Sequence, residues 1–434
     1  MSRYTAVKGM NDILPPDSLR WSRMEEDLRL LAARLNYQEI RTPVVESLEL
    51  FQRGLGETSD VVQKEMYVFE DKNGNKLALK PEGTAGFKLA LKPEGTAGVV
   101  RAFIEHSVGI EKPGPHKLFY IGPNFRYERP QKGRYRQFHQ FGLEIFGDPT
   151  PEMDAELIYA ASMILDHFKV KGEIRVNSIG CPACRPAYRE KLIEYFRPKA
   201  EELCGDCRRR IDSNPLRLID CKVDAPRDRW NDIPLITDHL CPQCASDFER
   251  LKKALAIFHV PFVVDPFIVR GLDYYVKTAF EITADTGGTQ NAIAGGGRYD
   301  NLVAETGGAA TPATGFAIGL ERLLSVVPED FYGMQPLAMG FALFDGGVAV
   351  LVHLTKHLSH HPVRYMAEYT PRKFKNALQK ANKLGARHIF IFGEDEVKNQ
   401  QVLYKDLATG DQKTFGQHEV MAIVAMLMDK EIRK

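Results

Sequence analysis

The chain has 434 residues, of which 44% are hydrophobic and 26% are charged, and its formal net charge at pH 7 is +1. This length is sufficient for two or three domains with buried cores. The near-zero net charge excludes nucleic-acid binding through an overall basic surface, so any such contact must come from local basic patches. Because the sequence has no run of about 18 apolar residues and no apolar signal core at its start, we expect a cytoplasmic, soluble protein without membrane contact.

The first predicted element is an amphipathic helix at 18–35, where Trp21, Met24 and Leu28 recur at helical spacing. A strand is predicted directly after it, at 37–45. A helix followed by a strand begins many globular folds, so this pair alone identifies no family.

A tandem repeat occupies residues 76–99, where the sequence KLALKPEGTAG occurs twice and only the residue after each copy differs. Each copy contains Pro-Glu-Gly-Thr, which supplies the polar residues Glu82 and Thr84 in the first copy and Glu94 and Thr96 in the second. Pro93 would interrupt a helix that followed the first copy, whereas the second copy leads directly into a predicted helix at 99–106. A helix is therefore expected to follow the second copy more readily than the first.

The stretch at 117–147 predicts two strands joined by a basic loop. Apolar and polar side chains alternate in 117–129 and again in 138–146, which gives each strand one core face and one polar face. On the polar face, Gly142 is expected to leave room for a ligand against the sheet. The loop between the strands, Arg-Pro-Gln-Lys-Gly-Arg-Tyr-Arg at 129–136, concentrates positive charge that suits phosphates.

The sequence FRYERPQKGRYRQFHQFGLE of this hairpin, from Phe125 to Glu144, resembles motif 2 of class II aminoacyl-tRNA synthetases, in the form found in the histidyl-tRNA synthetase family. The helix and strand at 18–45 resemble motif 1, which builds the dimer interface in that class. The resemblance implies a histidine–tRNA ligase that acts as a homodimer. Its implied substrates are L-histidine, ATP with Mg²⁺, and tRNA(His).

Seven cysteines follow between 181 and 244, most of them in Cys-x-x-Cys pairs. An odd number in this arrangement fits reduced thiols or metal ligands better than a disulfide framework. Four thiolates from two of the three pairs could complete a tetrahedral zinc site in a small inserted domain, and reduced cysteines without a metal are the open alternative. The candidate zinc ligands are Cys181, Cys184, Cys204, Cys207, Cys241 and Cys244.

Two further stretches resemble the same family. Arg-Gly-Leu-Asp-Tyr-Tyr at 270–275 resembles a histidyl-specific signature, and strands are predicted on both sides of it, at 261–269 and 275–282. A glycine-rich turn is predicted at 294–300, where the backbone would approach the substrate closely. The stretch 313–324 resembles motif 3, a strand that leads into a helix.

The expected fold class is α+β, an antiparallel sheet flanked by helices with a small inserted domain and a C-terminal α/β domain. Strands such as 388–392 alternate with helices such as 373–384 beyond a linker at 326–335, and the family has its anticodon-binding domain here. The expected boundaries are 1–180 and 259–328 for the catalytic domain, 181–258 for the insertion and 335–434 for the anticodon-binding domain.

The resemblance also implies residue roles. The expected ATP-binding residues are Arg126, Glu128, Arg270 and Arg322. The three arginines among them are also the expected catalytic residues. The expected histidine-binding residues are Glu94, Thr96, Gln140, Glu144, Tyr274 and Tyr275, with Glu82 and Thr84 as the alternative copy. The expected tRNA contacts are Gln131, Arg134 and Arg136.

Two alternatives of other classes remain at this point: a non-catalytic regulatory subunit of ATP phosphoribosyltransferase, and a sensor that binds uncharged tRNA. The regulatory relatives lack the anticodon domain and typically lose the catalytic arginines, both of which this sequence has. The sequence contains no Gly-Lys dipeptide and therefore no Walker A loop, so phosphates must be held by side chains. Arginine suits that task because its planar fork matches phosphate oxygens in two places.

Overall fold

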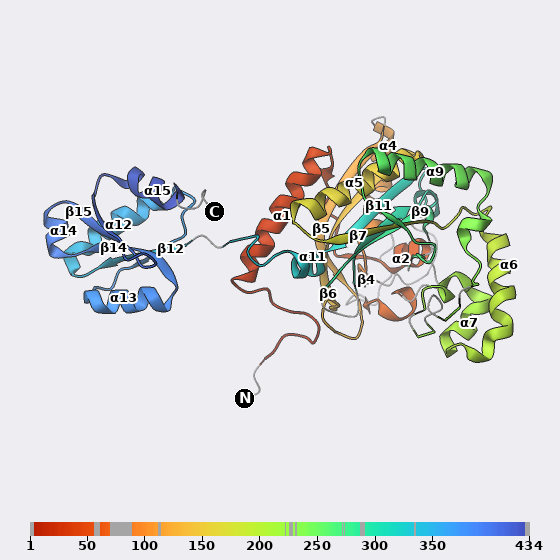
Figure 1. Ribbon diagram of the computed structural model, residues 1–434, viewed down its shortest axis with the longest axis horizontal. Coiled ribbons are helices and arrows are strands. Elements are labelled where there is room, and N and C mark those ends of the chain that lie inside the picture. Colours follow the sequence, from red (N-terminus) through yellow and green to blue (C-terminus); the bar gives the residue numbers. More distant parts are fainter. Residues whose placement is uncertain are drawn as a thin grey trace, which may run out of the picture. The chain divides into compact units, whose positions relative to one another are not determined.

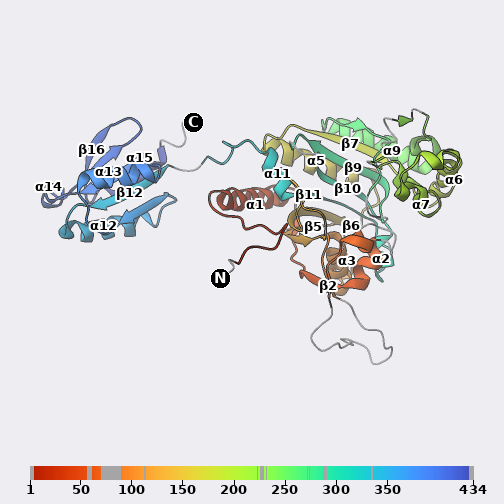
Figure 2. The same ribbon diagram turned by 90° about the horizontal axis from the view of Figure 1, so that it is seen from below.

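The computed structural model of the protein divides into two compact units, Met1–Phe331 and Tyr332–Lys434, which are drawn in Figures 1 and 2. The structure describes residues 4–55, 61–69, 89–111, 114–221, 223–224, 229–230, 232–270, 272, 274–286, 291–333 and 336–429. The first copy of the repeat, with Glu82 and Thr84, lies outside these residues.

An eight-stranded sheet forms the centre of the first unit, in the order β1-β5-β6-β11-β10-β9-β7-β8. Neighbouring strands are antiparallel except in the pairs β1 with β5 and β7 with β8, which lie at the two edges. The strands are β1 Gln38–Glu39, β5 His116–Phe125, β6 Gln137–Phe146, β7 Gly172–Ser178, β8 Val263–Val264, β9 Val276–Ala284, β10 Ala292–Arg298 and β11 Ala313–Gly319. The predicted α+β class is confirmed.

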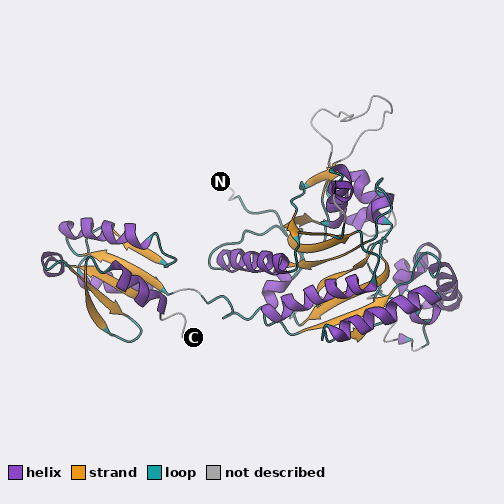
Figure 3. Cartoon of the chain, turned by 90° about the horizontal axis from the view of Figure 1, so that it is seen from above, coloured by secondary structure: helices purple, strands orange, loops and turns teal. Residues whose placement is uncertain are grey.

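Helices pack against this sheet. Two of them, α5 and α9, lie side by side along one face (Figure 3). Their bounds are Pro151–His167 and Pro242–Ile257, and α1 at Asp17–Arg34 packs beside α5. The motif 3 helix, α11 at Leu320–Val326, follows β11 directly.

A second layer carries the second copy of the repeat. Its described residues form a small antiparallel sheet in the order β2-β4-β3 and four helices. Phe51, Val99 and Tyr120 belong to the buried core between this layer and the main sheet. The elements are β2 Val45–Ser47, β3 Val68–Phe69, β4 Leu89–Leu91, α2 Leu48–Leu55, α3 Thr96–Glu105, α4 Val108–Glu111 and α10 Leu302–Glu305, with a π-helical turn at Val61–Glu65. The helix predicted at 99–106 is confirmed as α3, but it begins earlier than expected, at Thr96 inside the second copy of the repeat.

The described residues of the segment 181–258 form helices, turns and loops, and none of them forms a strand. Helices α6 and α7 gather at one end of the unit (Figure 1). Tyr188, Leu192 and Phe196 on α6 form a small separate core with Ile211 on α7. The elements are α6 Arg185–Phe196, α7 Gly205–Ser213, and 3-10 turns at Arg197–Glu202, Pro215–Leu218 and Ile236–His239.

The second unit is a five-stranded mixed sheet in the order β13-β12-β14-β15-β16, with helices on both faces. Helices α12 and α15 supply Leu351 and Ile423 to the core on one face, and α13 supplies Ala377 and Ala381 to the other. The elements are β12 Leu337–Ala342, α12 Asp345–Leu358, β13 Tyr365–Glu368, α13 Phe374–Lys383, β14 Ala386–Phe392, α14 Glu394–Lys398, β15 Gln401–Asp406, β16 Gln412–Gly416 and α15 Val420–Asp429. The predicted C-terminal α/β domain is confirmed. Among the described helices of both units, none combines the length and apolar character needed to cross a membrane.

Three local predictions differ from the structure. The strand predicted at 37–45 is reduced to β1 and the start of β2, and the strand at 261–269 is reduced to β8. The glycine-rich turn predicted at 294–300 is wrong, because 292–298 forms strand β10. A Cβ atom at Gly296 would lie 2.2 Å from the carbonyl oxygen of Gly315 on β11, so glycine there allows close packing of adjacent strands.

Candidate active site

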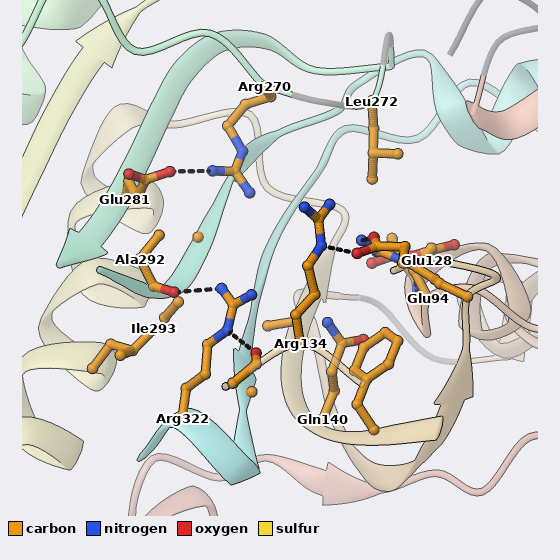
Figure 4. Close-up of a pocket in the computed structure, with 18 of the residues that line it drawn as sticks. Glu94, Glu128, Arg134, Gln140, Arg270, Leu272, Glu281, Ala292, Ile293 and Arg322 are labelled. Carbon is orange, nitrogen blue, oxygen red and sulfur yellow. Dashed lines mark hydrogen bonds and ion pairs between the residues drawn. The ribbon is translucent and has the colours of Figure 1, made fainter. Parts of the chain in front are cut away.

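A cavity of about 400 Å³ is lined by residues of the β5–β6 loop and of the neighbouring strands β9 and β10, and Figure 4 shows many of its lining residues. The structure brings together most of the residues that the sequence predicted. Those in its walls are Glu94, Thr96, Arg126, Glu128, Arg134, Gln140, Arg270, Tyr274, Tyr275 and Arg322. Three predicted residues do not line it: Gln131, Arg136 and Glu144.

Arg270 lies before β9 and points into the cavity between Glu281 and the backbone of Gly295 (Figure 4). One guanidinium nitrogen is 3.5 Å from a carboxylate oxygen of Glu281, and the guanidinium carbon is 5.5 Å from the ring centre of Tyr275. Its Nε is buried and has no hydrogen-bond partner among the described residues. A Cβ atom at Gly295 would lie 2.4 Å from the guanidinium, so this glycine provides space for Arg270.

Arg322 binds backbone carbonyls at the cavity wall. Arg322, on α11, donates from Nε to Gly133 in the β5–β6 loop at 2.8 Å and from Nη1 to Ala292 at 2.6 Å. Burial lowers the pKa of Arg322, and Arg134 and Arg126 lower it further. Arginine nonetheless stays protonated, because its ordinary pKa is above about 12. The site therefore concentrates cationic groups.

Arg126 connects the motif 2 strand to the second copy of the repeat. Its Nε donates to the carbonyl of Pro93 at 2.9 Å, and its guanidinium lies 5.3 Å from the ring centre of Phe138. Burial lowers its pKa, while the carboxylates of Glu65 and Glu94 raise it. Arg126 thereby fixes the backbone immediately before Glu94.

The tip of the β5–β6 loop turns back into the cavity. Arg134 forms an ion pair with Glu128, whose side chain is only 6% exposed. The tip closes through two backbone hydrogen bonds between Gln131 and Arg134, and Gly133 there has a φ of +71°, which favours glycine. Arg136 lies outside the cavity, with its guanidinium carbon 4.3 Å from the ring centre of Tyr127.

Acidic and polar side chains also line the cavity. Glu94 accepts backbone hydrogen bonds from Thr96 at 2.7 Å and Ala97 at 2.9 Å, which positions its carboxylate at the start of α3. Burial raises the pKa of Glu94, and these hydrogen bonds oppose that effect. Gln140 accepts a hydrogen bond of 2.8 Å from the amide of Asn124 on the neighbouring strand. Asn124 thus orients Gln140 at the cavity wall.

Glu144 lies behind this wall and is fully buried. It accepts hydrogen bonds from the hydroxyls of Thr96, at 2.7 Å, and Tyr299. Burial raises the pKa of Glu144 to about 8, so the carboxyl is largely protonated at neutral pH. Gly315 on β11 pairs directly with Glu144, and a Cβ atom there would lie 1.7 Å from its carboxyl oxygen. The glycine of motif 3 therefore provides the space for this carboxyl.

The interpretation of Gly142 as space for a ligand is wrong. A Cβ atom at Gly142 would lie 2.2 Å from the ring of Tyr120, and one at Gly95 would meet the same ring at 2.2 Å. Tyr120 pairs with Gly142 across β5 and β6 and fills the space that both glycines leave. A buried tyrosine, and not the substrate, explains these two glycines.

The cysteines form two groups. In the first, the Sγ atoms of two Cys-x-x-Cys pairs lie within 4.8 Å of one another, and the members are Cys181, Cys184, Cys241 and Cys244. In the second, the pair of Cys204 and Cys207 meets Cys221 and Asp224 within the same distance. Cys221 and Asp224 were not predicted as zinc ligands, because neither belongs to a Cys-x-x-Cys pair.

Tyr299, Glu281 and two residues of the insertion, Arg217 and Asp220, were also not predicted from the sequence. Tyr299 donates to Glu144, and the other three line the cavity. A signal existed for Tyr299, which follows the glycine-rich stretch directly. The insertion residues carried no comparable signal.

An antiparallel sheet that presents arginines to a substrate, in place of a phosphate-binding glycine loop, is the architecture of the class II aminoacyl-tRNA synthetases. The comparisons with known proteins agree. A family model described as histidyl-tRNA synthetase matches residues 9–180 and 235–323, and an anticodon-binding-domain model matches 345–427. The chain belongs to the histidyl-tRNA synthetase family.

Curated relatives match almost the whole chain. A histidine–tRNA ligase of Thermodesulfovibrio yellowstonii is 41% identical over 99% of this chain and 100% of its own length, and one of Desulforudis audaxviator is 45% identical over 95% and 96%. The structure of apo histidyl-tRNA synthetase from S. aureus covers 97% of this chain and 100% of its own, with 33% identity and a TM-score of 0.77. These matches do not favour the regulatory-subunit alternative.

Replacement of Glu144 by Gln tests the buried carboxyl. Because the folded-state pKa is about 8 and the ordinary value is 4.5, the folded protein keeps a proton that the unfolded chain releases between these values. The proton therefore contributes its full free energy of unfolding below the ordinary pKa, and this contribution is lost as the pH rises towards 8. Relative to Glu144→Gln, the wild type should lose up to ~1.4 kcal/mol of unfolding free energy per pH unit in this window.

Denaturant unfolding between about pH 5 and 8 measures the difference. Glu249→Gln, which changes an exposed carboxylate, is the control and should follow the wild type. Parallel pH profiles for the wild type and Glu144→Gln would contradict a buried neutral carboxyl.

Proposed function

We propose that in this cavity the carboxylate of L-histidine displaces pyrophosphate from ATP to form histidyl-adenylate, and that the 3′-terminal hydroxyl of tRNA(His) then takes the histidyl group and releases AMP. The observation that supports this most directly is the convergence of Arg126, Arg270 and Arg322, from three separate segments, on one cavity that Glu94 and Thr96 also line. The arginines suit a triphosphate, and the carboxylate of Glu94 suits an ammonium group.

At the phosphate end, Arg270 and Arg126 neutralise the charge that develops on the α-phosphate when the histidine carboxylate attacks it. The unpaired Nε of Arg270 is a buried donor ready for such an oxyanion. Arg322 stabilises the departing pyrophosphate. Glu281 lines the cavity and would hold the Mg²⁺ that accompanies ATP, since Mg²⁺ prefers carboxylate oxygens.

At the amino-acid end, Glu94, Thr96 and Gln140 hold the α-ammonium group of histidine. Tyr274 and Tyr275 line the cavity beside them and form the imidazole site. Glu144 supports this site from behind through its hydrogen bonds to Thr96 and Tyr299. A site with buried polar groups rejects analogues that would leave those groups unpaired.

The β5–β6 loop serves both ATP and tRNA in this proposal. Glu128 orients the adenine, and its present partner Arg134 must then move away. Arg134 becomes available to the tRNA backbone together with Gln131 and Arg136, which lie outside the cavity.

We also propose that Cys181, Cys184, Cys241 and Cys244 bind one structural zinc ion. The Sγ atom of Cys181 lies 3.6 Å from that of Cys184 and 3.9 Å from that of Cys241. Four thiolates around zinc at about 2.3 Å would be about 3.8 Å apart. Because these cysteines lie where the chain enters and leaves the insertion, the metal would close its base.

We propose that the chain acts as a homodimer in the cytoplasm, where its tRNA substrate is charged. Motif 1 has that interface role in the class. The small sheet beside it exposes apolar side chains, with Val45, Val68 and Phe69 each about two-fifths exposed. Sedimentation equilibrium should give twice the mass of one chain.

Replacement of Arg270 by Ala tests the phosphate end. Loss of a buried charge-assisted contact in the transition state costs roughly 3–4 kcal/mol, so adenylate formation should slow by a factor of ~100 to 1,000. Single-turnover quenching with ATP labelled at the α-phosphate measures this rate. Arg53→Ala, which changes an exposed arginine on α2, is the control, and an equal rate in both variants would remove Arg270 from the reaction.

The repeat provides a matched pair of variants, Glu94→Gln and Glu82→Gln, in identical local sequences. Glu94 lies in the cavity wall at the start of α3, so its loss should raise the KM for histidine at least ~10-fold, as expected for a lost charged contact of about 1.5 kcal/mol or more. Glu82→Gln should leave that KM unchanged. Steady-state aminoacylation measures both, and the reverse pattern would assign the site to the first copy.

Removal of the four-cysteine zinc should loosen the base of the insertion. After complete chelation under reducing conditions, amide hydrogen exchange in α6 and α9 should accelerate, because both helices begin at cysteines of this group. Helix α12 of the second unit is the internal control. Unchanged exchange in α6 and α9 would show that these cysteines need no metal.

A further inference from the structure

The second cysteine group lies outside the part of the chain that matches the family model. That model stops at residue 180 and resumes at 235, and this group consists of Cys204, Cys207, Cys221 and Asp224. The family model therefore does not describe this group. It also takes no part in the reaction described above, so its purpose must be inferred from its own geometry.

The four side chains have the dimensions of a coordination sphere. Their ligand atoms all lie within 4.8 Å of one another, and the Sγ atoms of Cys204 and Cys221 are 3.9 Å apart. Tetrahedral zinc holds its thiolates about 3.8 Å apart, whereas a disulfide needs about 2.05 Å. The arrangement fits metal binding and does not fit a disulfide.

Backbone amides point at these ligand atoms. Cys207 donates to the Sγ of Cys204 at 3.5 Å, Asp224 donates to the Sγ of Cys221 at 3.5 Å, and Cys204 donates to a carboxylate oxygen of Asp224 at 2.9 Å. Cys204 is also the residue that precedes the first turn of α7. Amides and a helix N-terminus both favour anionic ligands, and several anions in one buried cluster require a cation between them.

The two groups together account for all seven cysteines of the chain. The first group has four thiols and the second has three, and Asp224 supplies the missing fourth ligand. Asp224 is only 8% exposed, although a carboxylate is rarely buried without a partner. The odd cysteine number therefore has a structural explanation.

The second group also determines what faces the active site. Its ligands Cys207 and Cys221 enclose the turn at Pro215–Leu218, and Cys221 directly follows Asp220. Arg217 and Asp220 line the active-site cavity and lie 3.1 Å apart. Arg217 also donates to the backbone carbonyl of Arg270 at 3.2 Å. A metal here would hold the insertion against Arg270, which binds the α-phosphate in the proposed reaction.

We propose that Cys204, Cys207, Cys221 and Asp224 bind a second zinc ion, and that this zinc positions Arg217 and Asp220 at the active site. Thiolate-rich tetrahedral sites select zinc among the common divalent ions. In a segment without described strands and with a small core, two metal sites supply crosslinks that a sheet would otherwise provide.

Metal analysis of the intact, reduced protein tests the proposal directly. The wild type should contain two zinc ions per chain. The double variant Cys207→Ser/Cys221→Ser and the double variant Cys184→Ser/Cys244→Ser should each retain one. A wild type that contains a single zinc, which is lost only with Cys184 and Cys244, would overturn the second site and leave the first intact.

Asp224→Asn keeps all seven thiols and provides a milder test. In this variant, the second site should bind zinc more than about 10-fold more weakly than in the wild type, since even changes outside the first coordination shell cost that much. Competition with a chromophoric chelator, which takes up the released zinc, measures this loss. Asp212→Asn, an exposed carboxylate of the same segment, is the control. Equal release from both variants would overturn the role of Asp224.

The inference can fail while the proposed function stands. If Asp224→Asn releases its zinc and still forms adenylate at the wild-type rate and with the wild-type KM for ATP, the second zinc binds but does not position Arg217. If the wild type contains no zinc but forms adenylate normally, both metal sites are wrong and the catalytic assignment is unaffected.

Discussion

The cavity is organised by electrostatic balance between arginines and the groups that hold them. Arg126, Arg134, Arg270 and Arg322 face one small space, where like charges would repel one another strongly if they had no partners. Each is met by a carboxylate or a backbone carbonyl: Pro93, Glu128, Glu281, Gly133 and Ala292 supply these groups. In the proposed reaction, the phosphates of ATP would replace these partners with stronger ones, so the site would need no phosphate-binding loop.

Space is the second constraint, and glycines provide it. Gly295 admits the guanidinium of Arg270, Gly315 admits the carboxyl of Glu144, and Gly142 admits the ring of Tyr120. Each of these glycines lies on a strand, so the sheet itself carries the gaps. The rigid strands thereby limit the positions that these three side chains can take, which suits the proposed reaction because it tolerates little displacement of its groups.

Periodic segments and contiguous motifs were predictable from the sequence. Helices α1 and α5, the β5–β6 hairpin and the strand and helix of motif 3 have strong local signals, and so do the site residues they carry. What could not be predicted depends on contacts between distant segments. Tyr120 fills the gap at Gly142, Asp224 joins three cysteines, and Arg217 reaches the cavity from the insertion, and none of these has a local pattern.

Histidine-dependent exchange of labelled pyrophosphate into ATP, with Mg²⁺ and without tRNA, tests the central claim most directly. The claim is that the converging arginines and the acidic side chains beside them suffice to activate histidine. Purified protein should therefore exchange pyrophosphate with histidine and not with other amino acids. Protein that binds histidine and never exchanges pyrophosphate would contradict this account and indicate a non-catalytic relative.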